Sequence, residues 1–271
     1  MSDLPLSDLK IVDLSWVVAG PAIGRALADY GAQIVRVESG TRIETARVVG
    51  PFHEGKPGVE RSALYGNVNA GKLGLSLDLS VESARNVVRD LVRWADVVIE
   101  AFSPGVMARW GLDYQALRQI KPDLIMLSTS LMGATGPYAT FAGYGNVGAA
   151  LSGFQNIIGW PDRPPHGPFG PYTDYVGPRF SLVMLLAALD HRRRTGQGCA
   201  IDLSQAEAGI HFLAPQMADY FAQGRVTERQ GNRDPSMAPH GVYPCRERED
   251  GLVSWIAVAV RDDAEWQRLA V

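Results

Sequence analysis

The stretch from residue 167 to 180, GPFGPYTDYVGPRF, places one carboxylate, Asp174, between two tyrosines and surrounds it with prolines and glycines. Three roles are open to this aspartate: the N-cap of a helix that starts near Val176, one member of a general acid/base pair, or a carboxylate nucleophile. N-capping is the commonest of the three. A cap, however, needs neither the flanking aromatic rings nor the glycine-rich segment upstream, so the surroundings favour chemistry.

Two cations lie where they could hold phosphate. Lys72 stands in a glycine-containing loop, NVNAGKLGLSLDL, which lacks the spacing of a Walker motif. Arg109 follows the apolar run DVVIEAF at the position where doubly wound sheets bind ligands. The turn after the first apolar run, SWVVAGPAIG, lacks the middle glycine of the dinucleotide fingerprint. The pattern therefore disfavours NAD binding, and each cation alone is typical of a solvated surface.

The elements that must position these residues alternate along the chain. Apolar runs KIVDL, AQIVRVE, DVVIEAF and DLIMLSTS are separated by the helical patterns PAIGRALADY, VESARNVVRDLVRWA and YQALRQI. This rhythm predicts an α/β fold with a Rossmann-like parallel sheet that helices cover on both faces. Residues 39–70 interrupt it with glycine, proline and charge, and we interpret them as a long surface excursion.

The second half of the chain predicts a change of domain. We expect residues 1–220 to form the large domain and residues 221–271 to form a linker and the start of a smaller second domain. GLVSWIAVAV reads as a buried strand, and DDAEWQRLAV reads as the first turns of a helix. We therefore expect either a fragment of a longer chain or a partner chain that completes the small domain.

Composition narrows the class of ligand. With 20% charged residues and a formal net charge of -3, the overall balance predicts neither a nucleic acid nor a membrane surface as partner. Cys199 and Cys245 show no pairing or metal-ligand spacing, so we expect a reduced, cytoplasmic protein without a metal. A polyanionic ligand would have to be held by local cations.

Four segments together make the sequence recognisable. VDLSWVVAGPAIGRALADYGAQIVRVES, NAGKLGLSLDL, ADVVIEAFSPGVMARWGL and PYTDY, in this order and spacing, resemble the family III CoA-transferases, which include formyl-CoA transferase and carnitine CoA-transferase and are related to α-methylacyl-CoA racemase. The resemblance implies a homodimer of interlocked chains. Because the family's C-terminal return to the large domain is missing here, we expect a C-terminally truncated chain that forms a homodimer or a hetero-oligomer with a related chain.

The resemblance also implies a mechanism and a set of contacts. Asp174 would attack an acyl-CoA donor and pass through an aspartyl anhydride and an aspartyl-CoA thioester, with coenzyme A as substrate and no metal. Residue type, and not the resemblance, suggests that Tyr144 and Tyr172, with Tyr175, face an acceptor acid larger and less polar than oxalate. A family asparagine is Ala101 here and an arginine is Ser39, so nucleotide contacts would shift to Arg36 or Arg42. The remaining family positions for CoA fall on Val17, Val18, Ala19, Lys72, Leu73, Phe102, Arg109, Ser130, Leu131 and Met132.

Two other functions stay open. An α-methylacyl-CoA racemase-type epimerase needs a second acid/base group, and Tyr144 stands where the racemase pattern has its histidine. A phenol with a pKa near 10 exchanges protons poorly at neutral pH, which disfavours this reading. A non-catalytic partner subunit of a heteromeric CoA-transferase is the second alternative, and the retention of Asp174 with its surroundings argues against it.

Overall fold

The computed structural model describes residues 4–247 and 250–270. These residues form two compact units. The first comprises the chain up to residue 152 together with residues 169–212, and the second comprises residues 153–168 together with the chain from residue 213. The domain boundary that the sequence predicts after residue 220 falls inside helix α10 (Ala214–Gln223) of the second unit.

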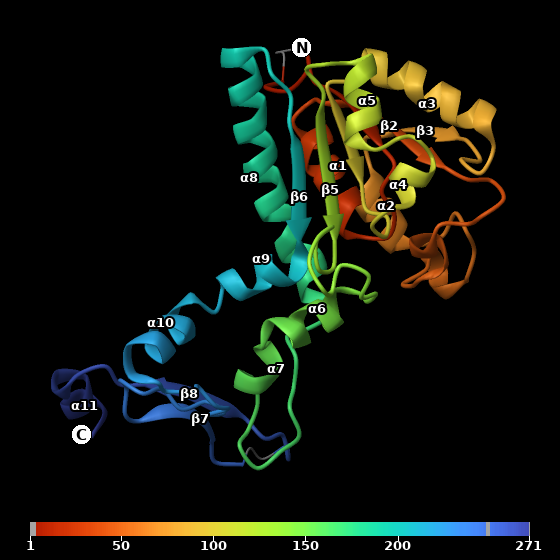
Figure 1. Cartoon of the computed structure of the whole chain (residues 1–271). Helices are drawn as coiled ribbons and strands as arrows, with labels where there is room; N and C mark the ends of the chain where they lie inside the picture. The colour runs from red at the N-terminus through yellow and green to blue at the C-terminus, as the bar shows by residue number, and fades with distance from the viewer. Residues whose placement is uncertain (1–3, 248–249, 271) are drawn as a thin grey trace. The chain divides into compact units, whose positions relative to one another are not determined.

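A six-stranded parallel sheet in the order β3-β2-β1-β4-β5-β6 forms the centre of the first unit (Figure 1). This is the Rossmann-like arrangement that the alternating pattern predicts, and the order reverses between β1 and β4. The strands are β1 (Lys10–Asp13), β2 (Gln33–Glu38), β3 (Leu73–Ser76), β4 (Val97–Glu100), β5 (Ile125–Ser130) and β6 (Ala200–Ser204). The helices of this unit outside residues 39–70 are α1 (Ala19–Asp29), α3 (Glu82–Trp94), α4 (Val106–Arg109), α5 (Tyr114–Ile120), α6 (Gly145–Ser152), α8 (Tyr172–Thr195) and α9 (Gln205–His211).

Both faces of the sheet are buried because alternate residues of each strand join two separate apolar clusters. In β4, Val97 and Ile99 pack in the cluster that contains residues of α1 and α8. Val98, between them, packs in the cluster that contains residues of α3, α4 and α5. Figure 1 shows α8 on one side of the sheet and α3 and α5 on the other. The strands therefore read as continuous apolar runs, and polar groups gather at their carboxyl ends.

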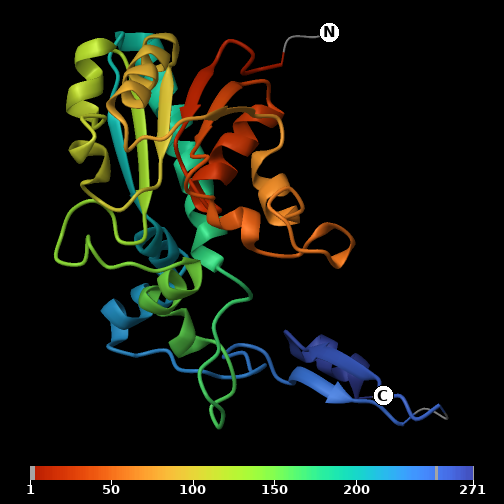
Figure 2. The same cartoon turned by 90° about the vertical axis from the view of Figure 1, so that its right-hand side faces the viewer.

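Residues 39–70 are more than the surface excursion that the sequence suggests. They form η1 (Thr45–Val48), η2 (His53–Gly55) and α2 (Ala63–Asn69), and Figure 2 shows this segment in orange beside α1. The side chain of Glu44 caps η1 by accepting a hydrogen bond from the N–H of Ala46. Both residues are buried. The excursion thus inserts a carboxylate into the interior of the first unit.

The second unit is smaller. Its strands β7 (His240–Pro244) and β8 (Trp255–Ala259) pair in antiparallel order, and its helices are α7 (Phe154–Ile157), α10 and α11 (Asp263–Leu269). The interpretation of β8 as a buried strand is wrong for this structure, because Trp255 is 62% and Ile256 is 53% exposed. Throughout the part of the chain that the structure describes, each helix is too short or too polar to cross a membrane.

Candidate active site

A pocket of about 720 Å³ opens at the carboxyl edge of the sheet. Its walls come from the turn after β1, the loop after β4, the end of β5 and the segment that leads into α6. The first turn of α8 supplies Asp174. The pocket brings together eight of the residues named from the sequence, which are Val17, Val18, Ala19, Phe102, Ser130, Leu131, Tyr144 and Asp174.

Asp174 lies inside the first turn of α8, whose N-cap is Pro171. The N-cap interpretation is therefore wrong, because the helix begins earlier than the sequence suggests. One carboxylate oxygen, Oδ2, instead accepts a hydrogen bond of 3.2 Å from the N–H of Gly145 at the start of α6. Gly145 permits this approach because a Cβ there would lie 2.5 Å from the carbonyl oxygen of Pro171 and 2.7 Å from the amide nitrogen of Asp174.

The surroundings of Asp174 disfavour its charge. The residue is only 6% exposed. Burial raises the pKa of its carboxyl group to about 6, and hydrogen bonds from the Gly145 N–H and the Gln205 side chain act in the opposite direction. At neutral pH the carboxylate is still ionised but has lost much of its hydration shell. A poorly hydrated carboxylate is a stronger nucleophile than one in water.

Sequence reasoning missed Gln205, which lines the same pocket at the start of α9. The hydroxyl of Thr173 is within 3.1 Å of the carbonyl oxygen of Gly145 and 3.3 Å of Oε1 of Gln205, which ties α6, α8 and α9 together. The position directly after a strand at the carboxyl edge was the available signal. A glutamine by itself gave no signal of a functional role.

Thr129 is a second residue that the sequence did not single out. It is 2% exposed, lines the pocket at the end of β5, and its hydroxyl has no hydrogen-bond partner among the described residues. The neighbouring hydroxyl of Ser130 is likewise buried without a partner there. Buried polar groups are normally hydrogen-bonded, so these two hydroxyls are suited to contact a bound ligand.

The turn after β1 holds an unusual backbone conformation. Val17 has φ +68°, and a β-branched residue in the left-handed region costs about 1–3 kcal/mol. Its N–H donates a hydrogen bond of 2.7 Å to Oε1 of Glu44. Strain of this size is found mainly where the surrounding structure enforces it, and here it forms part of the pocket wall.

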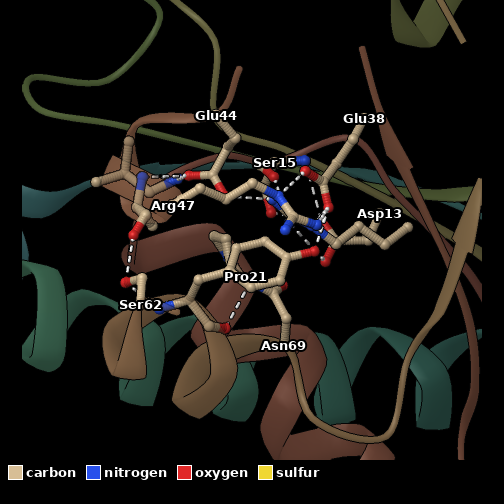
Figure 3. Close-up of polar contacts among 12 residues, drawn as sticks. Asp13, Ser15, Pro21, Glu38, Glu44, Arg47, Ser62 and Asn69 are labelled. Atoms are coloured by element: carbon tan, nitrogen blue, oxygen red, sulfur yellow. Dashed lines mark hydrogen bonds and ion pairs between the residues drawn. The ribbon is translucent and has the colours of Figure 1, made fainter. Parts of the chain in front are cut away.

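Arg36 and Lys72, expected to contact the nucleotide, belong to a buried ionic network. Figure 3 shows other members of this network, among them Asp13, Glu38 and Glu44. The Arg36 side chain is 1% exposed and pairs with Glu44 at 2.9 Å. The Lys72 side chain is 1% exposed and pairs with Asp13 at 2.8 Å. Burial opposes the charge of Asp13, yet the cations of Lys72 and Arg36 hold its pKa below its usual range.

The rest of the network balances these charges. Glu38 accepts hydrogen bonds from Arg36 and Arg47, and although burial acts against it, they lower the pKa of Glu38 to about 2. Arg36, Arg47 and Lys72 are thus paired with Asp13, Glu38 and Glu44, and Arg47 also pairs with the exposed Glu60 at 2.8 Å. The expectation that Arg36 and Lys72 contact the cofactor stays a prediction, and the structure adds that carboxylates already pair with both cations.

A second cavity of about 1140 Å³ lies beside the first and shares Trp16, Phe102 and Ser103 with it. Arg109 and Arg42 line this cavity. The ring of Phe102 packs edge to face on its aromatic neighbours, with ring centroids 6.2 Å from Trp16 and 5.3 Å from Trp110. The site therefore joins a buried carboxylate to an aromatic and cationic cavity.

Besides Arg36 and Lys72, three residues named from the sequence lie outside the lining of both cavities. Leu73 is 65% exposed at the start of β3, and Met132 and Tyr172 are half-buried. Tyr144 does line the first pocket, with 57% of its surface exposed. Across residues 4–247 and 250–270, no group of three or more His, Cys, Asp or Glu side chains is arranged to hold a metal ion.

Comparison with known proteins gives one consistent result. The sequence model of CoA-transferase family III matches residues 6–271. The succinate–glutarate CoA-transferase of Agrobacterium fabrum is 38% identical over 98% of this chain and 65% of its own length. The succinyl-CoA–D-citramalate CoA-transferase of Chloroflexus aurantiacus is 34% identical over 98% of this chain and 64% of its own length.

A solved structure agrees with these sequence relatives. The CAIB/BAIF family protein from Brucella suis superposes with a TM-score of 0.87 at 35% identity, covering 99% of this chain and 69% of that one. The chain spans slightly less than two thirds of the length of the two sequence relatives.

Proposed function

The chain belongs to CoA-transferase family III, and we propose that it moves coenzyme A from an acyl-CoA donor to a carboxylic acid, with Asp174 as the nucleophile. One observation supports this most strongly. A desolvated carboxylate lines a pocket that shares Trp16, Phe102 and Ser103 with a neighbouring cavity, and two arginines line that cavity. A thioester with a polyanionic nucleotide tail matches this combination.

The reaction proceeds by covalent exchange at Asp174. A carboxylate oxygen attacks the thioester carbonyl, a C–O bond forms, and the C–S bond breaks to release CoA thiolate. The thiolate then attacks the aspartyl carbonyl of the anhydride, which releases the donor acid and leaves an aspartyl-CoA thioester. The acceptor carboxylate attacks this thioester in turn. The thiolate, released again, attacks the acceptor acyl group and restores Asp174.

The geometry supports these steps at two points. When thiolate attacks the aspartyl carbonyl, negative charge develops on the Asp174 oxygen that now accepts the Gly145 N–H, which would act as an oxyanion donor. The Thr129 and Ser130 hydroxyls lie in the same lining without partners among the described residues. They are suited to bind the oxygens of the reacting acyl or carboxylate group.

CoA itself would bind across both cavities. We place its phosphates at Arg109 and Arg42 in the second cavity, because guanidinium groups bind phosphate through paired hydrogen bonds. The pantetheine arm would pass Phe102 and reach the wall formed by Val17, Val18 and Ala19. Arg36 and Lys72 have no direct part in this arrangement.

A trapping experiment tests the nucleophile. Incubation with succinyl-CoA, chosen because the Chloroflexus aurantiacus relative is named for a succinyl-CoA donor, should label the Asp174 peptide. Hydroxylamine should attack the carbonyl of the aspartyl-CoA thioester, release CoA and leave a hydroxamate that mass spectrometry locates at Asp174. The Asp174→Asn variant should show no label. A wild-type peptide that stays unmodified while the protein binds CoA would refute the covalent mechanism.

The same labelling assay can identify the acceptor acids. Dicarboxylic acids are the first panel to test as acceptors, because the relatives are named for succinate, glutarate and citramalate. An epimerase would instead exchange the α-hydrogen of an acyl-CoA with deuterium from solvent. Tyr144, which stands where the racemase pattern has its histidine, lines the pocket with 57% of its surface exposed.

Assembly belongs to the same proposal. We expect the active form to be a homodimer or a hetero-oligomer with a related chain, and native mass spectrometry of the purified protein distinguishes these. A monomer with full transferase activity would contradict this part of the proposal.

A further inference from the structure

A residue of the 39–70 segment, Glu44, accepts a hydrogen bond from the turn that connects β1 to α1. Val17 and Glu54 are the non-glycine residues with positive φ among those that the structure describes. Glu54 is exposed, whereas Val17 lines the pocket that holds Asp174. A β-branched residue does not adopt this conformation without an external hold.

Glu44 supplies that hold with both carboxylate oxygens. Oε1 accepts hydrogen bonds from the N–H of Val17 at 2.7 Å and of Ala46 at 3.0 Å. Oε2 accepts one of 2.9 Å from Nη2 of Arg36, whose Nη1 donates to the carbonyl oxygen of Ser15 at 2.8 Å. Figure 3 shows Glu44 and Ser15 on this network. The turn is therefore anchored by hydrogen bonds at the carbonyl oxygen of Ser15 and at the N–H of Val17.

The anchored segment, residues 15–17, is short and contributes to the walls of both cavities. Trp16, between the two anchored residues, lines both the Asp174 pocket and the neighbouring cavity. The Glu44 side chain is fully buried and the Arg36 side chain is 1% exposed, so solvent does not weaken the hold. A shift of this turn would move one wall of the pocket relative to Asp174.

We propose that Glu44 is a positioning residue that holds the Ser15–Val17 turn in its left-handed form and so sets the pocket wall opposite Asp174. This rests on the proposed function only for its effect on catalysis. Glu44 itself lines neither cavity, and it acts through the backbone of Val17. The buried network thereby serves the active site without touching substrate.

A double-mutant cycle tests the proposal in the full chain. Glu44→Gln keeps an oxygen for the Val17 N–H but loses the ion pair with Arg36, and Glu44→Ala removes both. We expect kcat for CoA transfer to fall about 10-fold in the first variant and about 100-fold in the second, with KM for acyl-CoA changing less than about threefold. Glu60→Ala, an exposed carboxylate of the same excursion, is the matched control and should leave both constants unchanged.

Glycine at position 17 separates positioning from general destabilisation. Gly adopts positive φ without strain, so the Glu44→Gln change should cost at least about fivefold less in a Val17→Gly background than in the wild type. An equal loss in both backgrounds would overturn the proposal. If the Glu44→Ala variant does not fold, the loss of kcat caused by Glu44→Gln can still be compared between the wild-type and Val17→Gly backgrounds.

A structural readout does not depend on activity. In a crystal structure of the Glu44→Ala variant, which removes the acceptor of the Val17 N–H, we expect Val17 to leave the left-handed region, whereas the Val17→Gly protein should keep it. Val17 at φ near its present value in the Glu44→Ala variant would refute the positioning role. If the wild type transfers no CoA from any ester tested, the proposed function fails while this structural prediction still stands or falls by itself.

Discussion

Replacing Asp174 by asparagine changes one buried carboxyl group and leaves its shape. Burial raises the pKa of Asp174 to about 6 from an ordinary value of 3.8, so the folded protein holds the proton more tightly than the unfolded chain does. The stabilisation from the protonated form is fully present below the unfolded pKa and is lost as pH rises through about 6. Asparagine cannot ionise and keeps an oxygen for the Gly145 N–H.

The shift gives the size of the effect. A difference of about two pKa units corresponds to about 3 kcal/mol once both states are ionised, near pH 8, and to about half of that at pH 5. The free energy of unfolding of Asp174→Asn, relative to that of the wild type, should therefore rise by about 2.5 kcal/mol from pH 4 to pH 8. The variant should also lose CoA transfer.

Urea unfolding of both proteins at several pH values between 4 and 8 measures this difference. The exposed Asp8→Asn variant is the control, and its difference from the wild type should stay within about 0.5 kcal/mol over the range. A stability difference for Asp174→Asn that does not change with pH would refute the reasoning, because the carboxylate would then not be destabilised by burial.

Three further variants test other parts of the site. Arg109→Ala should weaken CoA binding by about 10- to 100-fold in isothermal titration calorimetry, because it removes a charge-assisted contact, and unchanged affinity would exclude the second cavity as the phosphate site. Lys72→Met should lower the free energy of unfolding in urea by about 3–5 kcal/mol, since it leaves a buried carboxylate without its partner, whereas CoA affinity should change by less than about threefold. Gln205→Leu should raise the pKa of Asp174 further, because a hydrogen bond that lowers it is lost, and the acidic limb of single-turnover acylation should move to higher pH. A limb that stays in place would show that Gln205 does not act on Asp174.

The sheet could be predicted because its signal is local and repeated. Each apolar run is short, each is followed by a helical period, and a parallel sheet buried on both faces needs nothing else. The start of α8 was misjudged by a few residues, since PYTDYVGP contains two prolines and a glycine that usually end helices. Because the sequence suggested a helix start near Val176 instead of Tyr172, Asp174 became a candidate N-cap.

The buried network shows what a sequence cannot give directly. Arg36 lies in the middle of a strand covered on both faces, so its charge had to be paired inside the protein, and this was a readable signal. Its partners, however, come from β1 and from the excursion, and their identities depend on tertiary contacts. The sequence predicts that Arg36 and Lys72 contact the nucleotide, and it gives no sign of the carboxylates that pair with both side chains in the structure.

Three independent features of the Asp174 pocket lower the stability of the folded protein. Its carboxylate is ionised at neutral pH in spite of burial, Val17 has a strained backbone, and the Thr129 hydroxyl has no partner among the described residues. A sequence selected only for stability would remove each of these with a single substitution. Their coincidence in one lining, at the carboxyl edge of an otherwise regular sheet, is the pattern expected of a functional site. The apolar clusters on both faces of the sheet provide the stability that allows it.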